Sequence, residues 1–170
     1  MNDSNKRPKV KVPITAFEII LEAAGFILIV ILMVKTITSY STLPDRIPTH
    51  FNAAGRIDGW GGKGMLWFIP AIAGVMYIPM TLLGRFPRIF NYAVPITSEN
   101  AAKQYRLARQ MITALKLEIT ALLFYIQWMT IKSANAKEFG TGLGIAFLPI
   151  TLVAIFGTII FYIVKSIKNR

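Results

Sequence analysis

The chain has 170 residues, of which 54% are hydrophobic, and its mean hydropathy is +0.52. A soluble domain of this size has too little interior for so much apolar surface, so lipid is the expected solvent. The absence of cysteine excludes disulfides, thiolate metal sites and cysteine nucleophiles. The net charge of +11 would suggest nucleic acid binding in a soluble protein, but here the basic residues flank apolar runs. We therefore expect the lipid bilayer, and no nucleic acid, as a partner.

Four apolar runs each approach or exceed the ~20 residues that a helix needs to cross a bilayer. The predicted helices span about residues 14–37, 65–83, 98–131 and 142–164. An external loop, 38–64, follows the first helix, and the basic ends 1–13 and 165–170 are expected to be cytoplasmic tails. The predicted fold is an all-α integral membrane protein, with residues 14–164 as a single four-helix domain.

The third helix is predicted to begin well before its apolar part. Thr97 is a suitable N-cap, and Glu99 would lie at the positive end of the helix dipole. The basic residues near the helix ends on this side should contact the anionic inner leaflet. They are Arg85, Arg88, Lys103, Arg106 and Arg109.

Orientation follows from the distribution of Lys and Arg. The two tails and the connection between helices two and three carry twelve basic residues, whereas the other two connections carry five. The positive-inside rule then predicts that both termini are cytoplasmic and that the first loop is external. The expected location is the plasma (inner) membrane of a bacterium, as a multi-pass protein.

The first external loop is expected to fold as a short β-hairpin. Asn52-Ala53-Ala54-Gly55 fits a type I turn followed by a left-handed glycine, which is a three-residue hairpin loop with a G1 bulge. Apolar and polar residues alternate before the turn, and His50 and Asp58 would lie near each other across it. If the protein has a functional surface outside the membrane, we expect it here. The candidate residues are Asp45, His50, Asn52, Gly55 and Asp58.

Two runs of residues carry a family resemblance. The first, residues 43–63, reads L-P-D-R-I-P-T-H-F-N-A-A-G-R-I-D-G-W-G-G-K, and the second, residues 99–119, reads E-N-A-A-K-Q-Y-R-L-A-R-Q-M-I-T-A-L-K-L-E-I. Both resemble the bacterial membrane family known as domain of unknown function 1648, and the first is also similar to the segment that opens SdpI-type immunity proteins. For SdpI-type proteins the resemblance implies immunity against a secreted peptide toxin and sequestration of a repressor at the membrane. Those proteins have a further helical half that has no counterpart in this sequence.

Charged residues also lie inside the apolar runs. Glu18 and Glu22 are four residues apart and share one face of the first helix, and Lys116 and Glu118 lie in the third. A charge in the hydrocarbon costs at least ~2.5–3.5 kcal/mol, so such groups usually face the bundle and pair. Glu22 and Lys116 are each about four residues, or roughly 6 Å, inside the membrane from the same side. We therefore predict an ion pair between them. The pair could be structural, with Glu18 reaching back to the interface, or it could form part of a proton or cation path.

No catalytic or cofactor motif is recognisable. His50 is the only imidazole, which makes both a catalytic triad and a transition-metal site poorly supported. The glycines around Lys63 do not have the spacing of a phosphate loop. We expect no enzyme activity, cofactor or metal. Three functions stay open: a receptor or immunity-like protein whose external loop meets a peptide or envelope component, a small transporter or proton-coupled protein using Glu22 and Lys116, and a structural or assembly subunit.

Overall fold

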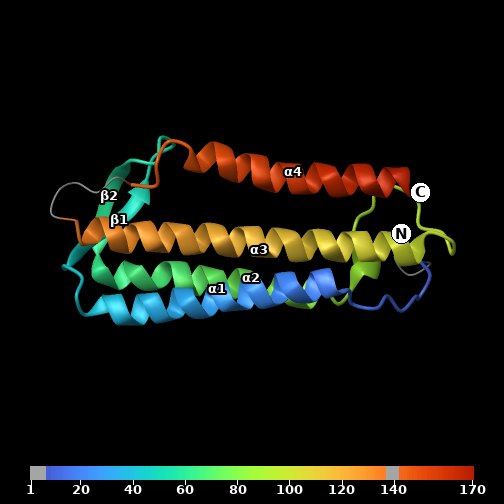
Figure 1. The fold of residues 1–170 in the computed structure, drawn as a ribbon, viewed down its shortest axis with the longest axis horizontal. Helices are drawn as coiled ribbons and strands as arrows, with labels where there is room; N and C mark the ends of the chain where they lie inside the picture. Colours follow the sequence, from blue (N-terminus) through green and yellow to red (C-terminus); the bar gives the residue numbers. More distant parts are fainter. Residues whose placement is uncertain (1–6, 137–141) are drawn as a thin grey trace.

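Four long helices run side by side in the computed structural model, which describes residues 7–136 and 142–170 (Figure 1). They are α1 (Ala16–Tyr40), α2 (Phe68–Leu83), α3 (Ala101–Ala134) and α4 (Phe147–Lys168). The longest helix, α3, lies in the middle and packs against the other three. A 3-10 turn, η2 (Lys63–Trp67), extends α2 to give the segment Lys63–Leu83. This segment and the other three helices are each long and apolar enough to cross a membrane. The predicted four-helix membrane fold is confirmed.

The predicted hairpin is also present, at one end of the bundle. Strands β1 (Arg46–Phe51) and β2 (Ile57–Gly62) pair antiparallel directly after α1 (Figure 1). The connection between α2 and α3 contains a second 3-10 helix, η3 (Pro87–Ile89), and lies at the opposite end. The described residues nearest to the termini, Arg7 and Arg170, lie at that opposite end too, since the chain runs through the bundle four times.

The bundle has apolar side chains outside and several polar side chains inside. Large apolar residues on the outer face of α4, such as Val153 and Phe156, are more than half exposed. Glu18, Gln104, Lys116 and Gln127 are instead buried, with exposed fractions of 2% or less. A soluble domain has the opposite distribution of polar and apolar side chains. It is the arrangement expected where lipid surrounds the helices and polar groups must find partners within the protein.

The helix bounds differ from the predicted ones where local hydrogen bonds compete with the helix. α3 begins at Ala101 and not near residue 98, because Asn100 donates to the Pro95 carbonyl and accepts from the Thr97 amide, which closes a turn first. Thr97 therefore belongs to this turn and is not the N-cap. α4 begins at Phe147 and not near 142, because Gly142 and Gly144 have positive φ angles of 63° and 83° and cannot continue a helix. α1 and α3 each extend three residues beyond their predicted ends.

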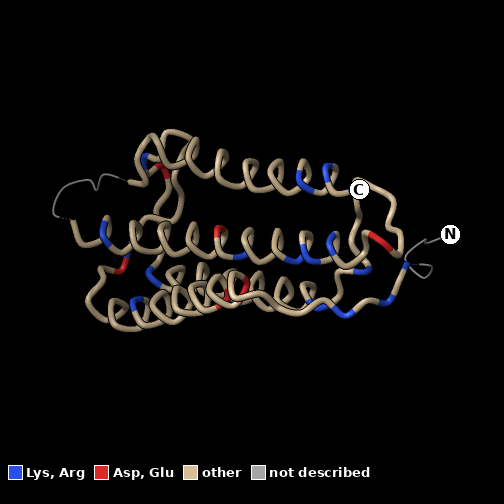
Figure 2. The backbone as a smooth tube through the Cα atoms, turned by 45° about the vertical axis from the view of Figure 1, so that its right-hand side comes forward, with Lys and Arg blue, Asp and Glu red and all other residues tan. Residues whose placement is uncertain are grey.

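Lys and Arg gather at the end of the bundle where the described chain starts and finishes (Figure 2). They lie on the residues before α1, on the α2–α3 connection, at the start of α3 and at the end of α4. The charge difference that the sequence suggests is thus a difference between the two ends of one bundle. Which end faces the cytoplasm stays a prediction from that charge difference.

Candidate functional site

The turn of the hairpin has the predicted form. The Gly55 amide donates to the Asn52 carbonyl at 2.8 Å, and Gly55 has a φ of 72°, which favours glycine. The Asn52 side chain accepts hydrogen bonds from the amides of Ala54 and Arg56, both at 3.0 Å. Asn52 and Gly55 therefore act through shape, because they fix the turn and present no free reactive group.

The other three candidate residues of the loop do not gather into one site. His50 Nδ1 and Asp58 Oδ1 are 2.5 Å apart across the hairpin, as expected, and both side chains are exposed. Asp45 lies at the base of the hairpin, where its carboxylate is 3.2 Å from Lys63 Nζ. Within residues 7–136 and 142–170, no three side chains of His, Cys, Asp or Glu come together as a metal site. Among the five candidate residues, His50 and Asp58 are therefore the two whose side chains contact each other.

The hairpin turn is docked onto the segment before α4. The Leu143 amide donates to the Gly55 carbonyl at 2.7 Å. A Cβ at Gly55 would overlap the backbone of Gly144, and one at Gly142 would overlap the Gly55 carbonyl. Sequence reasoning assigned Gly142 and Gly144 to a helix and missed this contact. Two glycines spaced two apart just before an apolar run are the signal that could have indicated it.

A cavity of about 280 Å³ lies beneath the hairpin, between β1 and the adjacent ends of α2, α3 and α4. Its walls are mostly apolar and include Ile47, Phe51, Ile69, Ile126 and Phe147. Gln127 and Thr130 of α3 are among its polar lining residues. The volume lies just below the ~300–1,000 Å³ typical of drug-sized ligands, so the cavity suits one or two amino-acid side chains.

Gln127 has an unused hydrogen-bond acceptor. Its Nε2 donates to the Thr36 hydroxyl at 2.8 Å and to the Leu66 carbonyl at 3.0 Å. Since a carbonyl can only accept, this contact fixes which end of the amide is nitrogen. The Oε1 atom is buried and has no hydrogen-bond partner among the described residues. Leaving a buried acceptor unpaired costs about 1–3 kcal/mol, so this oxygen is a polar weak point in the packing beside the cavity. Sequence reasoning missed Gln127, although a glutamine within an apolar run is itself a signal.

Inside the membrane domain, the predicted contact between Glu22 and Lys116 is present. Lys116 Nζ lies 2.6 Å from Glu22 Oε1 and 2.5 Å from Oε2. A third contact, 2.7 Å long, reaches the Thr81 hydroxyl of α2, and the Tyr77 ring centroid lies 4.4 Å from the same ammonium. An ammonium has three protons, and here three oxygen atoms accept them. Lys116 is 2% exposed, whereas 39% of the Glu22 side chain is exposed.

Comparison with known proteins finds a family match in the hairpin region. Residues 27–74 match the family model of a domain of unknown function, DUF1648. A curated relative from Archaeoglobus fulgidus, described as an uncharacterized protein, is 31% identical over 75 residues. The match covers 39% of this chain and 41% of the relative, so the chain spans less than half the length of the curated relative that it matches. No solved structure matches this chain.

The DUF1648 segment contains the end of α1, the whole hairpin and the first part of α2. All five candidate residues of the loop lie within it, and so do Ile47, Phe51 and Ile69 from the walls of the cavity. Glu22 and Lys116 lie outside it. The resemblance seen in the sequence is therefore confirmed for the hairpin region, while the link to SdpI-type proteins stays a resemblance.

The prediction that Glu18 reaches back to the membrane interface is wrong. Its side chain is 3% exposed, and Arg109 Nε and Nη2 donate to its carboxylate at 2.5 and 3.1 Å. The carboxylate also accepts from the Thr15 amide and hydroxyl, which completes a capping box at the start of α1. Arg109 therefore pairs within the protein, because α3 brings it to the level of the first turn of α1. For the same reason Arg109 is not available to the anionic leaflet.

Glu118 faces the opposite side of α3 from Lys116. Its Oε1 accepts a hydrogen bond from the Thr158 hydroxyl of α4 at 2.5 Å, and its Oε2 is buried without a partner among the described residues. The sequence marked Glu118 as a charge within an apolar run but gave it no partner. This contact ties α4 to α3, which matters because α4 is otherwise the most exposed of the four helices.

Proposed function

We propose that the protein is a receptor-type membrane protein, not an enzyme, and that its hairpin end binds a peptide or another envelope component. The observation that carries this proposal is the mostly apolar cavity beneath the hairpin, which the polar residues His50, Gln127 and Thr130 also line. Binding sites are typically apolar concavities with a few polar groups that fix the ligand's orientation. The walls of this cavity come from both the DUF1648 segment and the later helices.

The lining groups define the chemistry of the ligand. Apolar walls favour an apolar side chain, and the His50 and Thr130 side chains that also line the cavity can form hydrogen bonds with polar atoms of the same ligand. A peptide supplies both, because each residue carries an N–H next to its side chain. The exposed His50–Asp58 pair lies at the hairpin, where it could contact polar parts of the same peptide.

The proposed orientation has the hairpin outside and both termini in the cytoplasm of a bacterial cell. The gathering of Lys and Arg at the end of the bundle opposite to the hairpin supports it (Figure 2). In this orientation the cavity lies at the outer surface of the plasma membrane, where a secreted peptide would arrive.

Selection from a random peptide library tests the receptor function. Purified protein in lipid nanodiscs should enrich peptides that contain apolar residues. Ile126→Trp fills part of the cavity, so it should abolish binding of the selected peptides. Val153→Trp adds the same bulk to the exposed face of α4 and should leave binding intact. Failure to enrich any peptide, or equal binding to both variants, would contradict the proposal.

A second candidate function, proton- or cation-coupled transport, is favoured by one specific observation. A cavity of about 310 Å³ at the other end of the bundle is lined by Glu18, Glu22, Thr81 and Arg109, and through it Glu22 of the buried pair is partly exposed. A proton could reach the Glu22 carboxylate by this route.

Proteoliposomes that contain a pH-sensitive dye test this second candidate. Under an imposed membrane potential, the native protein should acidify or alkalinise the interior, and the Glu22→Gln/Lys116→Met double variant should not. A native protein that moves no protons would exclude proton transport, and the same assay with Na⁺ or K⁺ gradients applies the test to cations.

A further inference from the structure

The residues before α1 are held in a fixed position against the α2–α3 connection. Arg7 Nη1 donates to the carbonyls of Arg88 and Phe90 at 2.9 and 2.6 Å, and the Tyr105 hydroxyl donates to the Pro8 carbonyl at 3.0 Å. These contacts join chain segments that are more than 80 residues apart. The polypeptide around Pro8 therefore forms a stable wall at the terminal end of the bundle.

Tyr92 contacts both of these segments. Its hydroxyl donates to the Pro87 carbonyl of η3 at 2.7 Å, and its ring lies 5.3 Å from the Arg7 guanidinium. Burial raises the pKa of Tyr92 far above its ordinary value, so the hydroxyl stays protonated and keeps this contact. The turn at η3 is thus fixed relative to the residues before α1.

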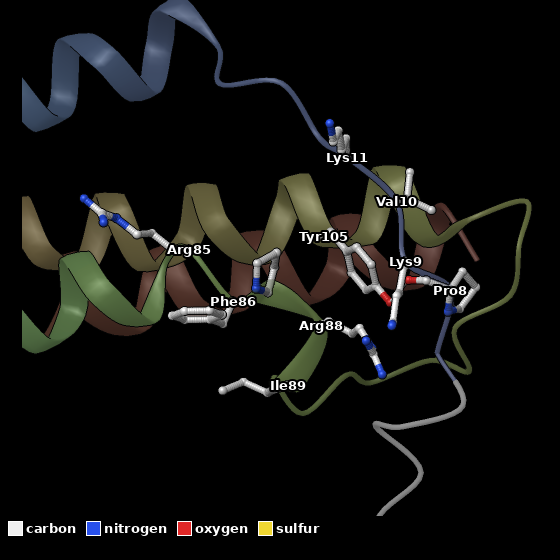
Figure 3. Close-up of a pocket in the computed structure, with 10 residues that line it drawn as sticks. Pro8, Lys9, Val10, Lys11, Arg85, Phe86, Arg88, Ile89 and Tyr105 are labelled. Atoms are coloured by element: carbon white, nitrogen blue, oxygen red, sulfur yellow. The ribbon is translucent and has the colours of Figure 1, made fainter.

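Between these two segments lies a pocket of about 500 Å³ (Figure 3). Among the described residues that line it, four are basic and none is acidic: the basic ones are Lys9, Lys11, Arg85 and Arg88. In Figure 3 they come from two chain segments, the N-terminal one and the connection that contains η3, with Tyr105 of α3 between them. A concave surface lined by Lys9, Lys11 and Arg85 favours an anionic ligand.

The pocket lies at the depth where phospholipid headgroups are found. The crossing segment Lys63–Leu83 has 21 residues, or about 30 Å at 1.5 Å per residue, which matches the hydrocarbon thickness of a bilayer. Arg85 follows two residues after its end. Phe86 and Ile89 line the same pocket and are each 59% exposed, which is unusual for large apolar residues beside basic ones in water. At a membrane boundary, the same two side chains would contact acyl chains while the basic groups contact phosphate.

We propose that this pocket binds the headgroup of an anionic phospholipid. Lys9, Lys11 and Arg85 line the pocket that takes the phosphate-bearing headgroup, and Phe86 and Ile89 pack against the start of the acyl chains. Nucleic acid fits less well, because a bound strand would need to extend into the lipid region where Phe86 and Ile89 lie. This site is at the other end of the bundle from the hairpin cavity and does not depend on the receptor function.

Native mass spectrometry of the detergent-solubilised full chain, titrated with single lipids, tests the site. Phosphatidylglycerol and phosphatidylcholine with identical acyl chains separate the effect of headgroup charge from that of the chains. The variant Lys9→Gln/Lys11→Gln/Arg85→Gln removes three charges that line the pocket, and it should weaken phosphatidylglycerol binding about tenfold or more, because these charges would lie next to the bound headgroup. The control variant Lys103→Gln/Arg106→Gln/Lys168→Gln removes three exposed charges at the same end, outside the pocket, and should change binding less than about twofold.

A charge-conserving variant, Lys9→Arg/Lys11→Arg/Arg85→Lys, should retain binding, which excludes an effect of misfolding. Equal losses in the pocket and control variants would overturn the proposal, because they would indicate diffuse surface charge. Preference for phosphatidylcholine would also overturn it. Displacement of phosphatidylglycerol by millimolar inorganic phosphate would indicate a free phosphate site, and displacement by a short RNA a nucleic acid site, and either result would overturn the lipid assignment.

Discussion

The two polar centres of α3, Lys116 and Gln127, differ in how completely their hydrogen-bonding capacity is used. Lys116 has three protons and three oxygen acceptors within 2.7 Å, two on Glu22 and one on Thr81. Gln127 uses both of its amide protons but leaves its buried oxygen without a partner among the described residues. A saturated centre holds helices together, whereas an unsaturated centre beside a cavity is held less completely and can rearrange when the cavity is filled. The comparison favours a structural role near Lys116 and a binding role near Gln127.

This comparison depends on which end of the bundle meets the outside of the cell. Because the chain has no native cysteine, single cysteines can report the two ends. Arg56→Cys on the hairpin should be labelled by a membrane-impermeant thiol reagent in intact cells, and Lys103→Cys near the start of α3 should be labelled only after lysis. Both positions are exposed in the structure, so burial would not explain a difference. Labelling of position 103 alone in intact cells would reverse the orientation and place the cavity inside.

If the centre at Lys116 is structural, breaking it should destabilise the protein strongly. Glu22→Gln leaves the buried ammonium of Lys116 without its counter-charge and should cost about 3 kcal/mol, measured by thermal unfolding in detergent. Lys116→Met should cost less, because the partly exposed Glu22 carboxylate can still be hydrated. The double variant should recover part of the loss, as coupled residues do. Glu99→Gln, at a fully exposed carboxyl outside the helices, is the control and should be neutral. Strictly additive losses would refute the coupling.

The stability of the hairpin that covers the cavity should depend on the shape of its turn. Gly55→Ala puts a Cβ at a positive φ and against the backbone of Gly144, and it should cost about 1–3 kcal/mol. Gly62→Ala is the matched control, since Gly62 has a φ of −66° and open space where a Cβ would lie. A drop in the unfolding temperature for Gly55→Ala and none for Gly62→Ala is expected. Similar stabilities for both variants would mean that the turn is not docked on the segment before α4.

The sequence predicts depth in the membrane better than it predicts which groups face each other. Apolar run lengths place the four helices, and counting residues from the same membrane side brings Glu22 to the level of Lys116. The turn at Asn52 is also readable, because its chemistry is local. Two contacts were not found: Glu18–Arg109, which joins α1 to α3, and Gly55–Leu143, which joins the hairpin turn to the segment before α4.

These missed contacts join residues about 90 positions apart, and the contact between Glu18 and Arg109 depends on how α1 and α3 are rotated about their axes. Hydrophobic patterning specifies such rotation poorly when lipid and protein interior are both apolar. The same reason applies to Gln127, whose partners Thr36 and Leu66 come from two other elements. A polar residue within an apolar run therefore indicates that a partner exists, but the structure is needed to identify it.

The smallest effect on stability is expected for the pair that the sequence singled out first. His50 and Asp58 contact each other at 2.5 Å, but their side chains are 70% and 41% exposed. Exposed ion pairs contribute only about 0–1 kcal/mol, so His50→Ala and Asp58→Ala should leave the unfolding temperature nearly unchanged. If the hairpin end is a binding surface, the same variants should nevertheless weaken the selected peptides, because the pair lies where polar parts of a ligand would approach. Asp45→Ala, which removes an exposed carboxylate at the base of the hairpin, is the control for charge. Unchanged peptide affinity in the His50→Ala/Asp58→Ala double variant would confine recognition to the other residues that line the cavity, with Thr130 as a remaining polar contact.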